Sequence, residues 1–181
     1  EGYYFRAPSL SRKVQDGALV ITADCSGLRL GGCSADVTIE VPTNVSVVVS
    51  SHGGPLSVSQ VKGDLDLAST GGKITVQTSF GHLRATSTSG AIELSDLSSS
   101  EVVARSTSGK VSATFSNAPS SVDVQSDAGA LSLKVPKKSG PYRVQADSAQ
   151  GKVTIDVRTD PQSPRAIRAH STSGAVQVAE G

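Results

Sequence analysis

The stretch at residues 87–94, STSGAIEL, joins a small polar run that ends in glycine to a strand of alternating apolar and polar residues. The same pattern returns at 106–113 (STSGKVSA) and 171–178 (STSGAVQV), and in looser form at 69–76, 126–133 and 148–155. Self-similarity at a fixed period of about 20 residues is typical of repeat architectures, in which each unit needs its neighbours to bury its apolar face. This repeat therefore decides the fold class.

Glycines mark the period of the repeat. The turn glycines are Gly54, Gly72, Gly90, Gly109, Gly129, Gly151 and Gly174, spaced 18, 18, 19, 20, 22 and 23 residues apart, with Gly63 and Gly81 halfway between the early ones. One coil of 18–23 residues thus consists of two units, each a turn followed by a strand. We expect the turn glycines to adopt positive φ at corners, where a Cβ would clash. The Ser and Thr residues before them are expected to hydrogen-bond the turns and tie neighbouring coils together.

Apolar residues occupy the second and fourth positions after each glycine, with polar residues between them. The apolar pairs are Leu65/Leu67, Ile74/Val76, Leu83/Ala85, Ile92/Leu94, Val111/Ala113, Leu131/Leu133, Val153/Ile155 and Val176/Val178. A period of two indicates strands with one buried face, and no stretch has the sustained spacing of an amphipathic helix. We predict an all-β, single-domain β-solenoid, a β-helix-like stack of short strands in which successive coils pack on one another.

The ends of the chain depart from the repeat. Residues 41–181 carry the repeats, whereas residues 1–40 do not, and 18–23 and 37–41 are predicted to be strands around a cysteine-flanked loop. Because a solenoid must cover its first exposed edge, we expect residues 1–40 to form an N-terminal cap. Residues 176–179 are predicted to be a short edge strand unless the native chain continues. The insertions at 136–141 and 160–164 are expected to form loops on one side of the stack.

Cys25 and Cys33 are the only cysteines, and the loop between them contains glycines. A disulfide here would contribute about 2–3 kcal/mol by constraining the unfolded chain. Two buried free thiols are the alternative, because two cysteines with no nearby His or further Cys cannot complete a tetrahedral metal site. The predicted disulfide implies an oxidising, extracytoplasmic location.

Composition excludes several classes of function. The net charge of +1 disfavours nucleic-acid binding, and no apolar run approaches the roughly 20 residues of a membrane span. The chain begins without Met or a signal-peptide pattern, so we expect a mature or trimmed fragment that has lost its targeting segment. With no Trp or Met and only three Phe and three Tyr, the core must consist of small aliphatic residues.

The Thr-Ser-Gly-x-Ile/Val repeat resembles that of a bacterial adhesin family of β-strand repeat proteins, whose common domain has no assigned function. The likeness covers nearly the whole chain. It includes the cysteine pair before 37–42 (VTIEVP), the unit 63–65 (GDL), and 135–136 (VP) ahead of 141–144 (PYRV). The resemblance implies a β-solenoid at the cell surface or secreted, often tethered by a membrane segment. It implies no catalytic residues.

The sequence offers little support for catalysis. His52, His82 and His170 are far apart and near turns, and no G-x-S-x-G elbow is present. Asp64, Asp66, Glu93 and Asp96 are candidate acids for a carbohydrate-active enzyme. Of these, Asp66 and Glu93 are outward residues that could approach one another on neighbouring coils, although solvated surface charge is the simpler interpretation. The turns also lack the carboxylates of a calcium-binding solenoid, and we predict no metal and no cofactor.

A basic stripe is the main candidate binding surface. Lys73, Lys110 and Lys152 follow their glycines at matching positions, and Arg84 lies nearby in the sequence. Such a stripe could bind anionic envelope polymers or lipid head groups. The alternative is that these lysines only protect exposed strands from aggregation.

We therefore expect a non-enzymatic, extracellular or cell-surface module that acts as an adhesin or binds an envelope component, such as a surface protein or glycan. It would bind no nucleic acid and would contact the membrane only through a tether absent from this fragment. One alternative is the ligand- or partner-sensing ectodomain of a membrane stress-response protein. The other is a carbohydrate-active enzyme.

Overall fold

The computed structural model describes residues 9–15, 18–24 and 36–181, and every regular element in these ranges is a β-strand. The predicted all-β class is confirmed. None of these residues belongs to a helix that could cross a membrane. The chain divides into two compact units, Glu1–Glu40 and Val41–Gly181, and each is described by itself.

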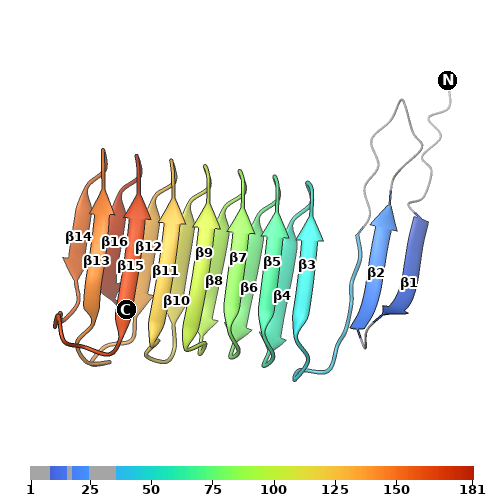
Figure 1. Cartoon of the computed structure of the whole chain (residues 1–181), viewed down its shortest axis with the longest axis horizontal. Helices are drawn as coiled ribbons and strands as arrows, with labels where there is room; N and C mark the ends of the chain where they lie inside the picture. The colour runs from blue at the N-terminus through green and yellow to red at the C-terminus, as the bar shows by residue number, and fades with distance from the viewer. Residues whose placement is uncertain (1–8, 16–17, 25–35) are drawn as a thin grey trace. The chain divides into compact units, whose positions relative to one another are not determined.

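The first unit contains a two-stranded antiparallel sheet, formed by β1 (Ser9–Gln15) and β2 (Ala18–Asp24) (Figure 1). Residues 37–41 were predicted as a strand, but they form none, and their apolar side chains are exposed. An alternating pattern forms a strand only where another strand pairs with it, and none of the described strands does so here. Cys25 and Cys33 lie outside the described residues, so their disulfide and the capping role of residues 1–40 stay predictions.

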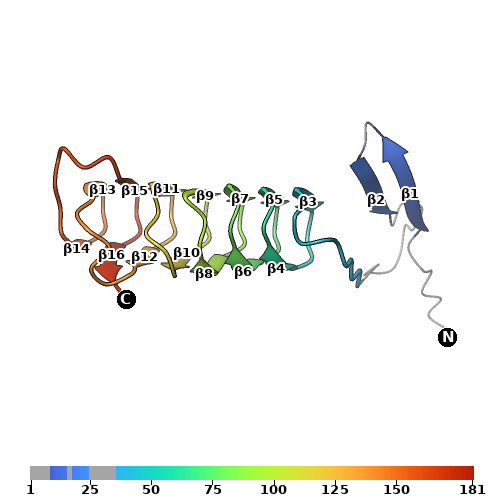
Figure 2. The same cartoon turned by 90° about the horizontal axis from the view of Figure 1, so that it is seen from below.

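The second unit is a β-solenoid of two parallel seven-stranded sheets that face each other (Figures 1 and 2). The odd-strand sheet contains β3 (Val47–Ser51), β5 (Leu65–Ser69), β7 (Leu83–Ser87), β9 (Glu101–Ser106), β11 (Ser121–Ser126), β13 (Arg143–Ser148) and β15 (Ala166–Ser171). The even-strand sheet contains β4 (Leu56–Val61), β6 (Ile74–Ser79), β8 (Ile92–Leu97), β10 (Val111–Phe115), β12 (Leu131–Val135), β14 (Val153–Asp156) and β16 (Val176–Glu180). Each coil gives one strand to each sheet, which confirms the predicted β-solenoid.

The core is a thin layer between the two sheets. Alternate residues of each strand point inward, as the period of two requires, and they are mostly Leu, Ile, Val and Ala. Seven of the eight predicted apolar pairs are buried; the exception is Val153 and Ile155. The expected aliphatic core is therefore fully buried in the interior coils, whereas the inward apolar residues of the first and last coils of the stack are mostly only partly buried.

The order of the coils departs from chain order at the C-terminal end. The coil formed by β15 and β16 lies between the β11/β12 coil and the β13/β14 coil. The prediction that residues 176–179 are an edge strand is therefore wrong, because β16 pairs on both sides and Val178 is 0% exposed. The edge strand is β14, which explains why Ile155 is 44% exposed.

Connector length allows this change of order. Three residues connect β4 to β5, β6 to β7 and β8 to β9, and five connect β10 to β11. Seven residues connect β12 to β13, which lies one coil further away, and nine residues lead from β14 back to β15. Each additional coil adds about 4.8 Å to the distance. The two predicted insertions are these longer connectors, and both join the even-strand sheet to the odd-strand sheet.

The turn glycines lie in the bends between strands, but the expectation of positive φ is wrong. In the described part of the chain, Gly140 is the one glycine with positive φ, at 92°. Close approach of the neighbouring coil is the actual constraint: a Cβ on Gly109 would lie 2.1 Å from the carbonyl oxygen of Gly90. Gly90 is related in the same way to Gly72, at 2.0 Å. The repeat therefore needs glycine so that backbones can stack.

Buried serines tie the same turns together. The Oγ of Ser126 accepts a hydrogen bond from the Gly129 N–H (2.8 Å) and donates one to the Gly109 carbonyl (3.3 Å) in the neighbouring coil. Ser171 repeats both bonds, with Gly174 and Gly129. The expected Ser ladder between coils is therefore present at these positions.

Candidate functional site

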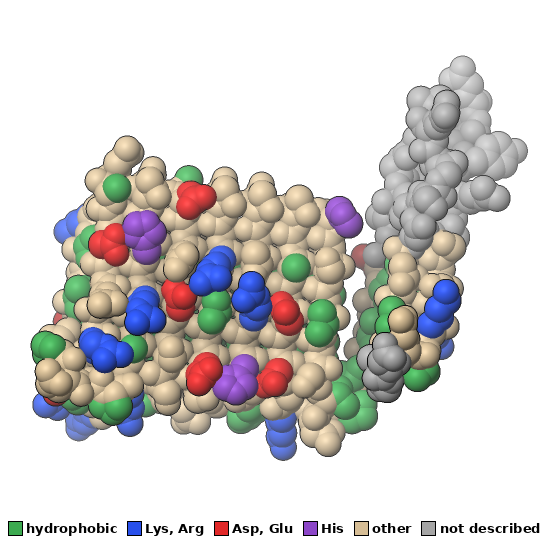
Figure 3. Space-filling view, viewed as in Figure 1, with side chains coloured by type: hydrophobic (Ala, Val, Ile, Leu, Met, Phe, Trp, Pro, Cys, Tyr) green, Lys and Arg blue, Asp and Glu red, His purple; other side chains and the backbone are tan. Residues whose placement is uncertain are grey.

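The outward face of the odd-strand sheet carries most of the charged side chains of the two sheets. Because neighbouring coils are in register, its side chains fall into three rows that run across the coils. The rows are Asp64, His82, Glu101, Ser121, Ala166, Arg143; Val48, Asp66, Arg84, Val103, Asp123, Arg168, Gln145; and Arg105, Gln125, His170, Asp147. Figure 3 shows acidic, basic and His side chains interspersed over this face, which we call the charged face.

Ion pairs connect neighbouring coils on the charged face. Arg105 Nη2 lies 3.1 Å from Asp123 Oδ2, and Arg84 Nε lies 4.0 Å from Asp66 Oδ1. His82 Nδ1 lies 3.2 Å from Glu101 Oε2, and His170 Nδ1 lies 2.5 Å from Asp147 Oδ2. Most of these side chains are about half exposed, so each pair contributes little to stability. Their main consequence is to hold charges of both signs in a fixed pattern at the surface.

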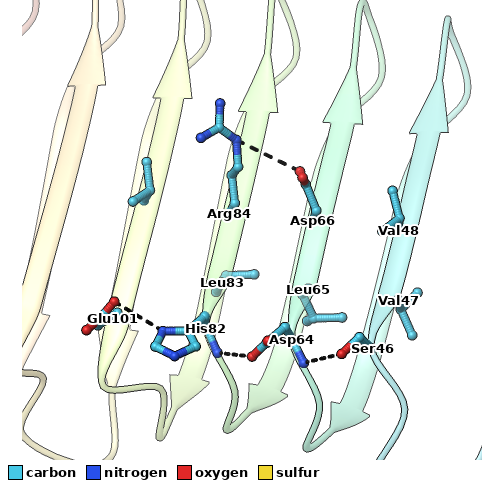
Figure 4. A pocket seen from close by; sticks show the side chains of 11 residues that line it. Ser46, Val47, Val48, Asp64, Leu65, Asp66, His82, Leu83, Arg84 and Glu101 are labelled. Atoms are coloured by element: carbon cyan, nitrogen blue, oxygen red, sulfur yellow. Dashed lines mark hydrogen bonds and ion pairs between the residues drawn. The ribbon is translucent and has the colours of Figure 1, made fainter.

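A shallow hollow of about 250 Å³ lies at the N-terminal end of the charged face. Figure 4 shows the side chains that line it, with the Arg84–Asp66 ion pair at one end, His82 and Glu101 near the other, and Val48 at its border. Asp64 Oδ1 accepts a hydrogen bond from the His82 N–H at 2.9 Å, which fixes the carboxylate beside the strand. Short valine side chains next to longer charged ones create the hollow. It offers charge of both signs and a small apolar area to a partner that lies along the sheet.

The structure separates the residues of the predicted basic stripe. Lys73, Lys110 and Lys152 directly precede β6, β10 and β14 of the even-strand sheet, whereas Arg84 lies on β7 of the odd-strand sheet. Alanines occupy the same position in coils between the lysines, and Lys73 Nζ forms an ion pair with Glu93 Oε2 at 2.7 Å. The structure thus does not bring these four cations together.

The predicted approach of Asp66 and Glu93 is wrong. Asp66 lies on β5 and Glu93 on β8, which belong to opposite sheets, and each forms an ion pair with a cation of its own sheet. Asp64 is on the charged face, and Asp96 is on the even-strand sheet at a bulge. No three His, Cys, Asp or Glu side chains in the described ranges are arranged to hold a metal ion.

Sequence reasoning missed the neighbours across coils on the charged face. Asp123 and Arg168 are adjacent because β15 pairs with β11, and Arg168 Nε also donates to Gln145 Oε1 at 3.2 Å. The alternating pattern indicates that all three residues point outward. Nothing in the spacing of the repeats indicates that β15 lies between β11 and β13.

Comparison with known protein families matches residues 11–179 to the family described as Toastrack DUF4097. No curated protein and no solved structure matches the chain.

Proposed function

The chain belongs to the Toastrack DUF4097 family, a repeat-type domain of unknown function, and we propose that it is a non-enzymatic binding module at the cell surface. The charged face would bind a component of the cell envelope, either a surface protein or a glycan. This interpretation includes the adhesin role that the resemblance implies.

The arrangement of charge on the charged face carries this proposal. Three rows of outward side chains lie on a parallel sheet whose strands are about 4.8 Å apart, so charges recur at regular intervals. Charged groups of fixed position favour complementary partners and oppose others, and thus provide specificity more than raw affinity. The hollow is open and shallow, which suits an extended partner that makes many weak contacts.

Two features of the sequence support an extracytoplasmic location. A disulfide between Cys25 and Cys33 would persist only in an oxidising compartment. The resemblance to cell-surface repeat proteins implies the same location. Both arguments are independent of the charged face.

Retention of the purified chain on cell-envelope and cytosolic fractions tests the proposal. Reversal of two cations on the charged face, by Arg84→Glu with Arg105→Glu, should lower retention on the envelope fraction at least about tenfold, because complementary contacts become repulsive. Lys110→Glu with Lys152→Glu is the matched control. It changes the net charge equally but acts on exposed residues outside the charged face, and retention should change less than about twofold.

Equal losses in both double variants would show that retention depends on overall charge and not on the charged face. Retention of the wild-type chain only on the cytosolic fraction would contradict an envelope partner.

A further inference from the structure

The two long edges of the solenoid differ in how their charged residues are distributed. At one edge the odd strands lead into the even strands through short turns, which contain one carboxylate, Asp127, and three cations in separate coils, Lys73, Lys110 and Lys152. At the other edge the even strands lead into the odd strands through the connectors 62–64, 80–82, 98–100, 116–120, 136–142 and 157–165. These connectors contain five cations, Lys62, Lys137, Lys138, Arg158 and Arg165, and only two carboxylates, Asp64 and Asp160. We call this second edge the basic edge.

The cations of the basic edge have no carboxylate partner in the described part of the chain. The ion pairs of the described residues involve Lys73, His82, Arg84, Arg105 and His170, and none involves one of these five cations. The two carboxylates of the edge accept hydrogen bonds from nearby backbone: Asp160 Oδ1 from the Gln162 N–H, and Asp64 Oδ1 from the His82 N–H. The positive charge of the edge is therefore available to an external anion.

The change in coil order concentrates this charge at the C-terminal end (Figure 3, lower left). The connectors 136–142 and 157–165 lie side by side, since the Tyr142 N–H donates to the Arg158 carbonyl and the Ser163 Oγ donates to the Pro141 carbonyl. The Arg165 guanidinium donates to the Ser139 carbonyl, so it joins the same two connectors.

Packing also holds these connectors in one arrangement. Tyr142 is 1% exposed, and its Oη donates to Ser139 Oγ at 2.9 Å. Lys138, with a φ of 59°, is held in a left-handed conformation that a non-glycine residue rarely adopts. The cations are thus positioned before any ligand binds, which lowers the entropic cost of binding.

Exposed apolar side chains lie on or beside the same edge. Phe80 is 45% exposed in the connector between β6 and β7. At the C-terminal end, Ile155 borders a hollow of about 520 Å³, whose other lining residues are Val157, two cations (Lys137 and Arg158) and two carboxylates (Asp156 and Glu180). Phe80 and Ile155 are separated by several coils, or about 20 Å. A bilayer surface can contact apolar and cationic groups over such a distance at once, whereas a soluble anionic polymer offers only the charge.

We propose that the basic edge binds the surface of a bilayer that contains anionic phospholipid. Lys62, Lys137, Lys138 and Arg158 would contact lipid phosphates, while Phe80 and Ile155 would enter the boundary between head groups and acyl chains. The proposal goes beyond the envelope partner of the charged face, and it replaces the expectation that this domain contacts the membrane only through a tether. Because the basic edge borders the charged face without including its central row, a lipid-bound domain would keep that face accessible.

Co-sedimentation of the whole chain with phosphatidylcholine vesicles, with and without phosphatidylglycerol, tests this proposal. The wild-type chain should bind only the vesicles with phosphatidylglycerol. Lys137→Glu with Arg158→Glu should lower the partition coefficient at least about 30-fold, because each cation near an anionic surface contributes about fivefold and two are lost. Lys110→Glu with Lys152→Glu, which changes the net charge equally, should lower it less than about threefold.

A second pair of variants tests the apolar contact. Phe80→Ser should weaken binding roughly tenfold, since the ring leaves water when it enters the head-group boundary. Val48→Ser, which removes an exposed apolar side chain from the charged face, should leave binding unchanged.

Three results would overturn the proposal. They are equal binding to both kinds of vesicle, a control double variant as defective as the edge variant, and binding of soluble polyphosphate without binding of vesicles. Because retention on the envelope fraction depends on Arg84 and Arg105 of the charged face, failure of one proposal can be distinguished from failure of the other.

Discussion

Gly109→Ala is expected to lower the free energy of unfolding by more than about 3 kcal/mol, a large share of the roughly 5–15 kcal/mol that stabilises a typical domain. The new Cβ would lie 2.1 Å from the Gly90 carbonyl oxygen and 2.6 Å from its carbonyl carbon. Overpacking costs about 1–3 kcal/mol where side chains can move aside. Here the obstacle is the backbone of the next coil, so relief requires the coils to separate and their hydrogen bonds to break.

Gly53→Ala is the matched control for this prediction. Gly53 lies in a turn of the same kind, no heavy atom lies within 4 Å of the position that its new Cβ would occupy, and its φ is not positive. The free energy of unfolding, measured by urea denaturation, should therefore change by no more than about 0.5 kcal/mol. Similar losses in both variants would show that the glycines are needed for backbone flexibility and not for the close approach of coils.

Val178→Asp should destabilise the protein by more than about 4 kcal/mol, because it places a carboxylate in an apolar core without a partner. Val178 is 0% exposed between two neighbouring strands of the even-strand sheet. Ile155→Asp should cost about 1 kcal/mol or less, since Ile155 lies on the edge strand and is already 44% exposed. Thermal or urea unfolding of the two variants measures the difference.

This pair of variants also discriminates between coil orders, because Ile155 and Val178 are register partners on adjacent strands. If the coils followed chain order throughout, β14 would be interior and β16 would be the edge strand. Ile155→Asp would then be the more damaging substitution, and that ranking would contradict the structure.

The sequence predicts the interior of the solenoid well, because burial in a strand follows the alternation of residues along it. Leu67, Ile74 and Val124 point inward whatever strand lies beside them, and outward residues such as Arg84 are identified by the same rule. The turn positions are equally predictable, since glycine recurs wherever two backbones approach. The reason for glycine was not predictable from conformational preference alone, because close approach between coils depends on the stack as a whole.

Neighbour relations between coils are less predictable, because every repeat matches the same template. Any coil can stack on any other in the same register, so the strands of 143–156 and 166–180 fit equally well beside β11 and β12. Only the length of the connectors hints at the exchange. The charged face depends on this exchange, since it places Arg168 between Asp123 and Gln145.

Local irregularities were also not apparent from the pattern. The strands β4, β6 and β8 each contain one residue more than β10. The additional residues, Gln60, Thr78 and Asp96, have positive φ. The Asp96 N–H instead donates to Thr114 Oγ1 at 3.3 Å. Such a bulge accommodates one extra residue in the strand. The residues at these positions are neither glycine nor asparagine, so the sequence gives no sign of a positive φ there.

The exchanged coil order sets the neighbours at the C-terminal end of the middle row of the charged face and brings together the two connectors of the basic edge. Cysteine cross-linking tests it most directly. Asp123 and Arg168 lie opposite each other on adjacent strands, whereas Asp123 and Gln145 are separated by one intervening strand. Adjacent strands are about 4.8 Å apart, within reach of a disulfide, and the second pair at about 9.6 Å is beyond it.

Mild oxidation of Asp123→Cys with Arg168→Cys, followed by peptide mapping, should therefore give a disulfide between these two positions. Asp123→Cys with Gln145→Cys should give none under the same conditions. A disulfide in the second variant and none in the first would show that the coils stack in chain order and not in the exchanged order.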